Sequence, residues 1–445
     1  MAKEVITSSL KTTIRKLRAE IEKKHGKTVD QLRLERDKRI NDTIRMKIPD
    51  RVPVTIQTGV FACKYAGIPL SAMYYYPVSY WEACVKTIVD FEPDTGGMAG
   101  VGTSGLINEL LDPKTSRWPG GNLPDNVPYQ FVEGEYMKEE EYDLFLSDPS
   151  DFVLRYYLPR TFGAFEPLAK LPPLRNQAGG FFSSLLMVLA QPEFRKLGKK
   201  ISLAVAEQDR QMKLAMKLAA LEAELGYPSQ FGPMGRGMGI GGVPFDAVSD
   251  FLRGMRGAML DMYRCPDKLL EACEKIQEWR FADAAPAVVD PQGNPPRIFM
   301  ALHRGSDGFM SKKQFEKFYW PGLKRAILKA IELGYIAAPF FEGVWDDKLE
   351  YLLELPKGKV IFWVERTDVF KAKKVLGDHM CIQGGVPPTI LQAGSPQDVE
   401  EHVKKLIKVV GKNGGLIVGP GSAMDYARPE NVKAMIDTVK KYGKY

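Results

Sequence analysis

The chain contains few of the residues that stabilise small secreted proteins and metal-rich domains. Its 445 residues include only five cysteines and four histidines. The cysteines are scattered at positions 63, 84, 265, 273 and 381, and no two of them form a C-x-x-C pair. This spacing disfavours both a disulfide framework and a zinc ribbon, so we expect mostly free thiols.

Long hydrophobic runs are also absent. No stretch of about 18 consecutive apolar residues occurs, which is the length that a membrane-spanning helix needs. The chain is polar from Lys3 onward and shows no hydrophobic segment of a secretory signal. These absences predict a cytoplasmic protein that does not bind to a membrane.

A strong excess of one charge is missing as well. The chain has 62 basic and 55 acidic residues, which leaves a formal charge of +7, and much of this excess lies in the first fifty residues. The basic clusters at 195–200 and 440–444 are short and lie in or beside expected helices, which is typical of a solvated helix face. The charge pattern therefore gives no indication of nucleic-acid binding.

The composition that remains is that of a globular protein with a large core. Apolar residues make up 44% of the chain and charged residues 26%, which are ordinary values for globular domains. The length exceeds that of most single cores, although α/β barrels with insertions reach it as one domain. One barrel with appendages and a two-domain protein are both compatible with this length.

The first 48 residues differ from the rest of the chain. Apolar residues recur there at helical intervals among Arg, Lys and Glu, with Gly26 as a break. We therefore expect an N-terminal helical arm at residues 1–48. Such an arm buries little surface alone, so it should pack on the main body or on a partner subunit.

Short β-rich runs alternate with amphipathic helical stretches from Pro49 onward. The clearest strands are expected at 51–56, 91–97, 297–302, 335–341, 360–364, 380–383 and 416–418. Each of the last five ends in polar or glycine residues and is followed by a helical pattern. Helices are expected at 246–263, 398–410 and 429–442. This alternation predicts the α/β class, with residues 49–445 forming a (β/α)8 TIM barrel. An open doubly wound sheet is the alternative.

The segment between the second and third of these strands has a different pattern. Residues 105–195 are irregular and rich in Pro, Gly and aromatic residues, which predicts elaborated loops on the active-site face. A long helix is expected at 199–225, and a strand with a glycine-rich loop at 230–242. The loop lacks both nucleotide-binding fingerprints. We therefore expect its glycines to let the backbone approach a large flat ligand, with Arg236 as a candidate anion contact.

Polar residues that follow the expected strands form the candidate site. His303 can move a proton near neutral pH, Arg304 can bind a carboxylate or phosphate, and Asp307 adds a carboxylate. Alternatively, the His-Arg pair only supports other groups. In a barrel, chemistry is concentrated at these carboxyl ends of the strands.

Two further strand ends carry acidic residues. Glu342 should emerge at the mouth of the barrel as a catalytic or metal-binding carboxylate, unless it only pairs with a nearby Arg. Glu365 is a candidate acid or base, and Asp368 is a candidate substrate contact or a cap of the next helix. Cys381 is a candidate metal ligand, although a buried structural role is the more common one for such a residue.

Several motifs, taken in order, resemble the uroporphyrinogen decarboxylase superfamily, and more closely its corrinoid-dependent methyltransferase branch. The resemblance rests on the segments 49–54, 242–245, 262–268, 383–388 with 391 and 394–396, and most strongly 416–421 through 428–435. It implies a barrel with a deep cleft at the carboxyl ends of its strands and often a homodimer. The implied substrate is a tetrapyrrole or a methyl donor.

The resemblance does not extend to the decarboxylase signature. Haem-pathway members carry an R-Q-A-G-R stretch after the first strand, whereas residues 57–62 here read Q-T-G-V-F-A. The methyltransferase branch carries an H-x-C-G and a P-G-C sequence for zinc. Here these places read F-F-E-G at 340–343 and P-G-S at 420–422. The resemblance thus leaves zinc possible only through other ligands, with Glu342 and Cys381 as candidates.

Three functions follow from these residues and from the resemblance. The first is a methyltransferase that passes a methyl group from a small methylated substrate to the cobalt of a separate corrinoid protein, with His303, Glu342 and Glu365 in catalytic roles. The second is a decarboxylase-type lyase on a tetrapyrrole or another acidic aromatic, with Arg304 and Arg236 binding carboxylates. The third is a non-catalytic relative that binds a corrinoid.

Overall fold

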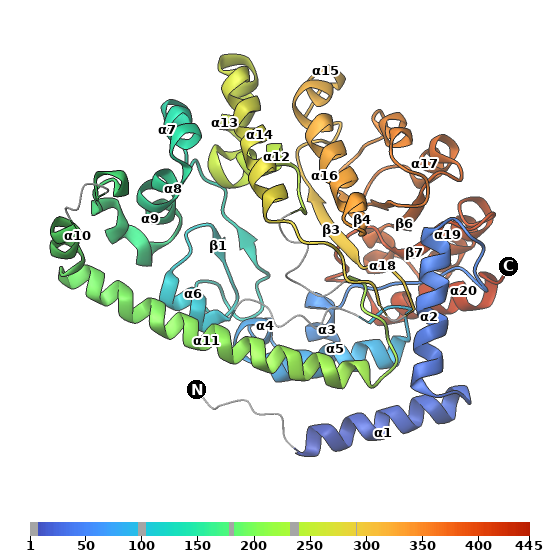
Figure 1. Ribbon diagram of the computed structural model, residues 1–445. Helices are drawn as coiled ribbons and strands as arrows, with labels where there is room; N and C mark the ends of the chain where they lie inside the picture. The colour runs from blue at the N-terminus through green and yellow to red at the C-terminus, as the bar shows by residue number, and fades with distance from the viewer. Residues whose placement is uncertain (1–7, 97–103, 178–181, 232–239, 291) are drawn as a thin grey trace.

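A parallel five-stranded sheet lies at the centre of the molecule. The computed structural model describes the chain except residues 1–7, 97–103, 178–181, 232–239 and 291 (Figure 1). The strands follow in sequence order as β3 (Arg297–Leu302), β4 (Ile336–Phe341), β5 (Ile361–Val364), β6 (Cys381–Val386) and β7 (Leu416–Pro420). All five coincide within a few residues with the strands that the sequence predicts.

Three further segments occupy strand positions beside this sheet. Val54 forms a parallel bridge with Val418 of β7. The Asp94 amide donates to the Val54 carbonyl at 2.8 Å, and the Gly96 amide donates to the Pro228 carbonyl at 2.7 Å. Main-chain bonds therefore link eight strand positions through seven junctions. This arrangement of parallel strand positions is that of an α/β barrel, so the predicted fold class is confirmed.

Side chains span the remaining junction, between residues 229–231 and β3. The Arg297 guanidinium donates to the Ser229 carbonyl at 2.6 Å. The rings of Phe231 and Phe299 lie 5.6 Å apart, centroid to centroid. These contacts bring the two edges of the described ring of strands together.

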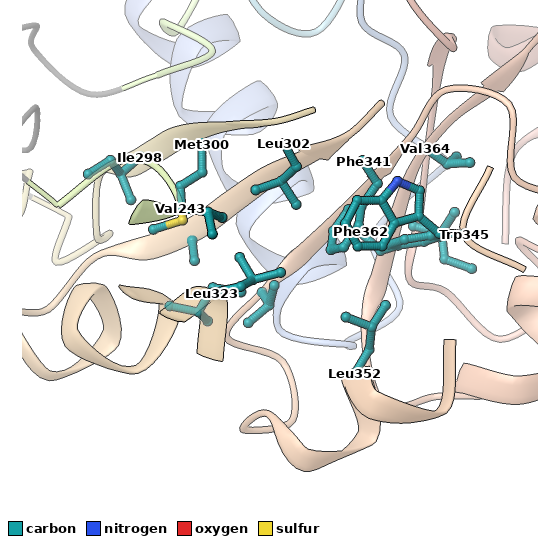
Figure 2. Packing of buried hydrophobic residues seen from close by; sticks show 14 of the residues in the cluster. Val243, Ile298, Met300, Leu302, Leu323, Phe341, Trp345, Leu352, Phe362 and Val364 are labelled. Carbon is teal, nitrogen blue, oxygen red and sulfur yellow. The ribbon is translucent and has the colours of Figure 1, made fainter. Parts of the chain in front are cut away.

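The outward face of the strands packs on the helices of the barrel. Ile298, Met300 and Leu302 alternate along β3 and are buried in one cluster with Leu323 of α16 (Figure 2). The period of two arises because successive side chains of a strand point to opposite faces. Burying one such side chain contributes roughly 1.5–3 kcal/mol, so this layer stabilises the barrel.

Helices and short turns of π- and 3-10-helix connect and cover the strands. They are α12 (Pro244–Ala247), η5 (Val248–Leu252), α13 (Gly254–Arg264), α14 (Pro266–Ala282), α15 (Lys312–Gln314), η6 (Phe315–Tyr319), α16 (Trp320–Glu332), η7 (Leu349–Glu354), α17 (Val369–Leu376), α18 (Pro388–Ala393), α19 (Pro396–Val409) and α20 (Pro429–Tyr442). The helices predicted at 246–263, 398–410 and 429–442 correspond to α12 through α13, to α19 and to α20.

The N-terminal arm is a helical hairpin that packs on the barrel. Its helices are α1 (Ser8–His25) and α2 (Val29–Ile44), and the Thr28 hydroxyl accepts from the Gln31 amide to cap α2. Ile40 and Ile44 of α2 are buried with inward-facing residues of β4, β5, β6 and β7. α2 therefore closes one end of the barrel, and of the two predicted packing partners the described arm uses the barrel.

The region before the long helix is a series of short elements. It contains α3 (Gly59–Ala66), α4 (Ala72–Tyr75), α5 (Pro77–Phe91), α6 (Gly105–Leu111), β1 (Ser116–Arg117), β2 (Gln130–Phe131), η1 (Glu139–Glu141), α7 (Tyr142–Ser147), α8 (Pro149–Phe152), η2 (Val153–Tyr157), α9 (Leu158–Thr161), η3 (Gly163–Lys170), η4 (Leu174–Gln177) and α10 (Phe182–Leu189). The long helix α11 (Pro192–Ala223) starts earlier than predicted, because Pro192 occupies its first turn. In Figure 1 α11 runs along one side of the molecule and returns the chain to the barrel. Within the described part of the chain no helix has the length and apolar character that a membrane span requires.

Candidate functional site

The predicted catalytic residues follow the carboxyl ends of three neighbouring strands. Leu302 pairs with Phe341, and Phe341 pairs with Val364, so β3, β4 and β5 end at one level. His303, Glu342 and Glu365 are the next residues along the chain. The parallel register therefore places all three at the same rim of the barrel, where this architecture carries its chemistry.

His303 lies between two carboxylates. Its Nδ1 is 2.5 Å from Oδ2 of Asp250, and its Nε2 is 3.6 Å from Oε2 of Glu342. The Asp250 side chain is 5% exposed and that of Glu342 is 50% exposed. The imidazole thus has a buried face toward Asp250 and an open face toward Glu342. Among the described residues, the side toward Glu342 is therefore the one from which a reacting group can approach Nε2 of His303.

The two partners raise the proton affinity of the imidazole. The hydrogen bond to Asp250 raises the pKa of His303, and the negative charges of Asp246, Asp250 and Glu342 add to it, while burial acts in the opposite direction. Burial pushes the pKa of Asp250 upward, but His303 and Arg304 outweigh it and hold that pKa below its ordinary value. An imidazolium donates from Nδ1 to Asp250 and lies within ion-pair distance of Glu342 on the side of Nε2. The geometry therefore favours a protonated His303 beside an ionised Asp250.

Asp246 fixes the backbone that carries His303. Its carboxylate accepts from the amides of His303 and Arg304, both at 3.0 Å, and from the Tyr319 hydroxyl at 2.7 Å. Burial raises the pKa of Asp246 to about 6, although these hydrogen bonds act to lower it. Since α12 carries Asp246 and η5 carries Asp250, one helical stretch positions both the loop and the imidazole.

Arg304 is engaged within the protein. Its Nη2 lies 3.0 Å from Oδ1 of Asp250, and its Nε donates to the Ser249 hydroxyl at 3.0 Å. Oε2 of Glu133 also lies 3.6 Å from Nη2 of Arg304. The predicted role of Arg304 in substrate binding would compete with these partners. In the described structure the guanidinium compensates the charge of Asp250.

Asp307, another predicted substrate contact, connects two loops of the rim. Its amide donates to the Val344 carbonyl at 2.8 Å, and its carboxylate accepts from the Asp347 amide at 3.1 Å. Nζ of Lys348 lies 3.4 Å from the carboxylate and also donates to the Gly305 carbonyl at 2.8 Å. These contacts hold the β3 and β4 loops against each other, which is a positioning role.

Glu365 and Asp368 contact the main chain rather than His303. The Gly343 amide donates to Oε2 of Glu365 at 2.5 Å, so Glu365 positions the loop that carries Glu342. Asp368 accepts from the amides of Phe370 and Lys371 and caps α17. Of the two roles weighed for Asp368, the helix cap is therefore the one that the structure shows.

Cys381 is distant from the rim. It begins β6 and pairs with Ile361 at the start of β5, whereas Glu342 follows the end of β4. Its side chain is completely buried in the apolar interior, and burial raises the pKa of its thiol. The sequence-based pairing of Glu342 with Cys381 as ligands of one ion is corrected by this geometry. They lie at opposite ends of the barrel strands.

The described residues also lack a cluster of metal-ligating side chains. No group of three or more His, Cys, Asp and Glu side chains in those residues is arranged to hold a metal ion. A zinc site takes three or four protein ligands, so the described rim does not fit one. Arg236 lies outside the described residues.

Asp246, Asp250 and Tyr319 were not identified from the sequence. The two aspartates stand four residues apart, directly after the 242–245 turn that opens a predicted helix. This spacing places both on one helix face and was an available signal. No local pattern marks Tyr319, because only the packing of η6 brings its hydroxyl to Asp246.

Comparison with known proteins connects this rim with a family. Residues 237–442, which include the five central strands and the Asp-His pair, match the model of the uroporphyrinogen decarboxylase (URO-D) family. Over these residues, somewhat less than half of the chain, the sequence is similar to that family. The resemblance expected from the motifs is thereby confirmed.

This chain matches only part of the length of each of the following relatives. A uroporphyrinogen decarboxylase of Helicobacter acinonychis is 32% identical over 141 residues, which are 31% of this chain and 39% of that protein. One from Syntrophotalea carbinolica is 20% identical over 210 residues, 46% of this chain and 59% of that protein. This chain therefore spans about two fifths to three fifths of the length of these curated relatives.

A solved structure shares the fold over nearly the whole chain. It is described as a methyltransferase from Methanosarcina mazei, with a TM-score of 0.54 and 15% sequence identity. The match covers 91% of this chain and 98% of that one. At this identity the likeness shows the fold alone, and it extends the barrel assignment beyond residues 237–442.

Proposed function

We propose that this protein is a methyltransferase of the uroporphyrinogen decarboxylase superfamily that transfers a methyl group from a small methylated substrate to a separate corrinoid protein. The observation that carries the proposal is the imidazole of His303, which is held by buried Asp250 and opens toward Glu342. A methyl group attached to oxygen or nitrogen leaves more easily when its former partner receives a proton. The printed name of the Methanosarcina mazei neighbour supports the same reaction class.

His303 supplies that proton in the proposed mechanism. Asp250 orients the ring through Nδ1, so Nε2 is the nitrogen that faces the substrate. Proton transfer from a positioned side chain contributes typically 10²–10⁴-fold to a rate. Glu342 lies on the open side of the ring, where its carboxylate can contact the substrate and keep the imidazole protonated between turnovers.

Glu365 acts in this mechanism by positioning. Its bond to the Gly343 amide fixes the turn that follows Glu342, and Gly343 adopts a φ of +84° there. This backbone conformation suits glycine, because a Cβ would lie 3.0 Å from Cβ of Ser306. A direct catalytic role for Glu365 stays a prediction.

Zinc would supply Lewis-acid polarisation of the substrate in related chemistry. Within the described residues, no three His, Cys, Asp and Glu side chains are arranged to hold a metal ion, at the rim or elsewhere. We therefore derive no step through a metal. The separate corrinoid protein, the homodimer and the cytoplasmic location are further parts of this proposal.

A decarboxylase-type lyase is the second candidate, because the curated relatives are named uroporphyrinogen decarboxylases. The charges of the described rim speak against a substrate with several carboxylates. Asp250 and Asp307 already compensate Arg304 and Lys348, and Glu342 adds a further exposed negative charge. A polyanionic substrate would meet more repulsion than attraction there.

A methyl-transfer assay with reduced cob(I)alamin and a panel of methylated oxygen and nitrogen compounds tests the proposal. The spectrum of cobalamin changes when its cobalt is methylated, and metal analysis of the same preparation detects zinc. We expect methylation with at least one compound, and a His303→Asn variant should lose about 100-fold or more in kcat with little change in KM.

Glu350→Gln is the matched control, because Glu350 is an exposed acid on η7, outside the rim. It should keep the activity of the parent chain. Full activity of His303→Asn would refute the proposed proton transfer. Formation of coproporphyrinogen from uroporphyrinogen, without any cobalamin methylation, would establish the lyase instead.

A further inference from the structure

A polar cavity lies between the N-terminal arm and the barrel, at the end opposite the catalytic rim. Its volume is about 290 Å³. It is lined by His25, Lys27, Leu32, Glu35, Arg36, Arg39, Arg51, Glu92, Asp94 and Lys440. Arg51 precedes the first strand position, which places the cavity at the amino ends of the strands.

The lining carries an excess of positive charge. Five Lys and Arg side chains and three carboxylates line it. Just outside the lining, Asp50 forms an ion pair with Arg39 and Lys24 forms one with Glu92, so two positive charges remain even with His25 neutral. The carboxylates are already engaged. Arg39 and Arg51 both bind Asp94, at 2.6 and 2.7 Å, and Lys27 binds Glu35 at 2.6 Å.

Arg36 is the cation whose charge is least compensated. Its side chain is buried, and Nη1 donates to the Gly226 carbonyl at 2.6 Å. Its guanidinium carbon lies 3.9 Å from the centroid of the Tyr227 ring. No carboxylate within the described chain forms an ion pair with it. A buried charge without an opposite charge is costly, so an anion in this cavity would be strongly favoured.

The basic groups around Glu92 indicate a positive electrostatic potential in the cavity. Lys24 and His25 approach its carboxylate from the arm, and Lys440 approaches it from α20. Burial alone would raise the pKa of Glu92, but these three basic groups lower it to about 2. These basic groups on the wall of the cavity therefore stabilise negative charge.

We propose that this cavity binds the phosphate group of a small molecule and thereby fixes the arm to the barrel. Arginine forks match the oxygens of phosphate through paired hydrogen bonds. The volume is about ten times the ~30 Å³ that one water molecule occupies. It accommodates inorganic phosphate or a small phosphate ester. The site is independent of the proposed methyl transfer.

Isothermal titration calorimetry of the full chain with inorganic phosphate and with AMP, at constant ionic strength, tests the site. Tighter binding of AMP than of phosphate would identify an ester as the ligand, and equal binding would identify the phosphate group alone. Hydrogen exchange with and without the ligand should show added protection of α1 and α2, since the ligand contacts arm and barrel together.

Three single-charge variants make the test specific. Lys27→Gln should weaken binding about tenfold, because one charge-assisted hydrogen bond is lost. Glu35→Gln should tighten binding, because it removes a carboxylate and frees Lys27. Lys433→Gln, an exposed change on the same helix as Lys440, should leave affinity unchanged. Lys27 and Glu35 are both nearly half exposed, so neither change should prevent folding.

Two results would overturn the proposal. One is that the parent chain binds neither phosphate nor AMP. The other is that Lys27→Gln and Glu35→Gln bind with the affinity of the parent chain, which would place any bound phosphate elsewhere.

Discussion

The pairing of Asp250 with His303 can be tested by Asp250→Asn, which keeps the shape of the side chain and removes its charge. The buried carboxylate of Asp250 contacts His303 and Arg304 together. An amide in its place can present at most one oxygen to two cationic donors. Both neighbours would keep their positions while losing their counterion.

The expected loss of stability follows from these contacts. A hydrogen bond to a charged group is worth roughly 1.5–3 kcal/mol, and removing one partner of a buried pair costs about 3–5 kcal/mol. Because the His303 side chain is 35% exposed, we expect the lower end, about 3 kcal/mol of unfolding free energy. The pKa of His303 should also fall, since the hydrogen bond to Asp250 is the main cause that raises it.

The pH dependence has a definite sign. A histidine with a raised pKa adds stability that is complete below its unfolded pKa of 6.5 and is lost as pH rises through the folded value. Asp250, whose pKa is lowered, adds stability above 3.8 that is lost as pH falls. The penalty of Asp250→Asn should therefore be largest near pH 5–6 and smaller near pH 9.

NMR titration of the imidazole signals measures the first effect directly. The chain has only four histidines, so a His303→Gln variant assigns the signal. Urea unfolding near pH 5.5 and pH 9 measures the second effect. Asp437→Asn, the same substitution at an exposed acid, should change neither. An unchanged His303 titration in Asp250→Asn would refute the proposed pair.

Two further substitutions test the surrounding structure. Tyr319→Phe removes a hydrogen-bond donor to Asp246, so it should raise the pKa of Asp246 above its value of about 6. The free energy of unfolding should fall by roughly 1–2 kcal/mol, and by more at pH 7.5 than at pH 5, because the carboxyl is already protonated at pH 5. Urea unfolding at both pH values measures this loss, and an equal loss at the two pH values would contradict the prediction. Ile44→Ala should lower the free energy of unfolding by about 2–5 kcal/mol, because α2 buries Ile44 in the barrel interior. Thermal unfolding measures this loss, with Leu34→Ala at an exposed position as the control. Equal effects of the two substitutions would show that the arm is not part of the core.

Local patterns in the sequence were sufficient for the regular elements of the barrel. The run at 297–302 alternates between side chains that pack on helices and side chains that face the interior, and β3 has those bounds. Helix α20 likewise coincides with the expected 429–442. Such segments carry their periodicity and their end signals within a few residues, so no distant contact is needed to recognise them.

The rim was recognised in part for the same reason. His303, Glu342 and Glu365 each follow an apolar run directly, and a barrel brings the carboxyl ends of its parallel strands together. The sequence did not show at which end of its strand Cys381 stands. It stands at the start of its strand, so the same rule places it at the other end.

Only the tertiary structure decided which groups surround His303 and where the arm lies. Asp250 is 53 residues away from His303 in the chain, and the pair forms because η5 packs beside the end of β3. A helical pattern likewise does not show that Ile44 is buried among strands whose residues, from Ile336 to Ile417, stand far later in the chain. Periodicity states which face of an element is apolar, whereas the partner of that face depends on how all the elements pack together. For this chain the sequence alone therefore determined the barrel elements and three of the rim residues, and packing determined the buried pair and the closure of the barrel by α2.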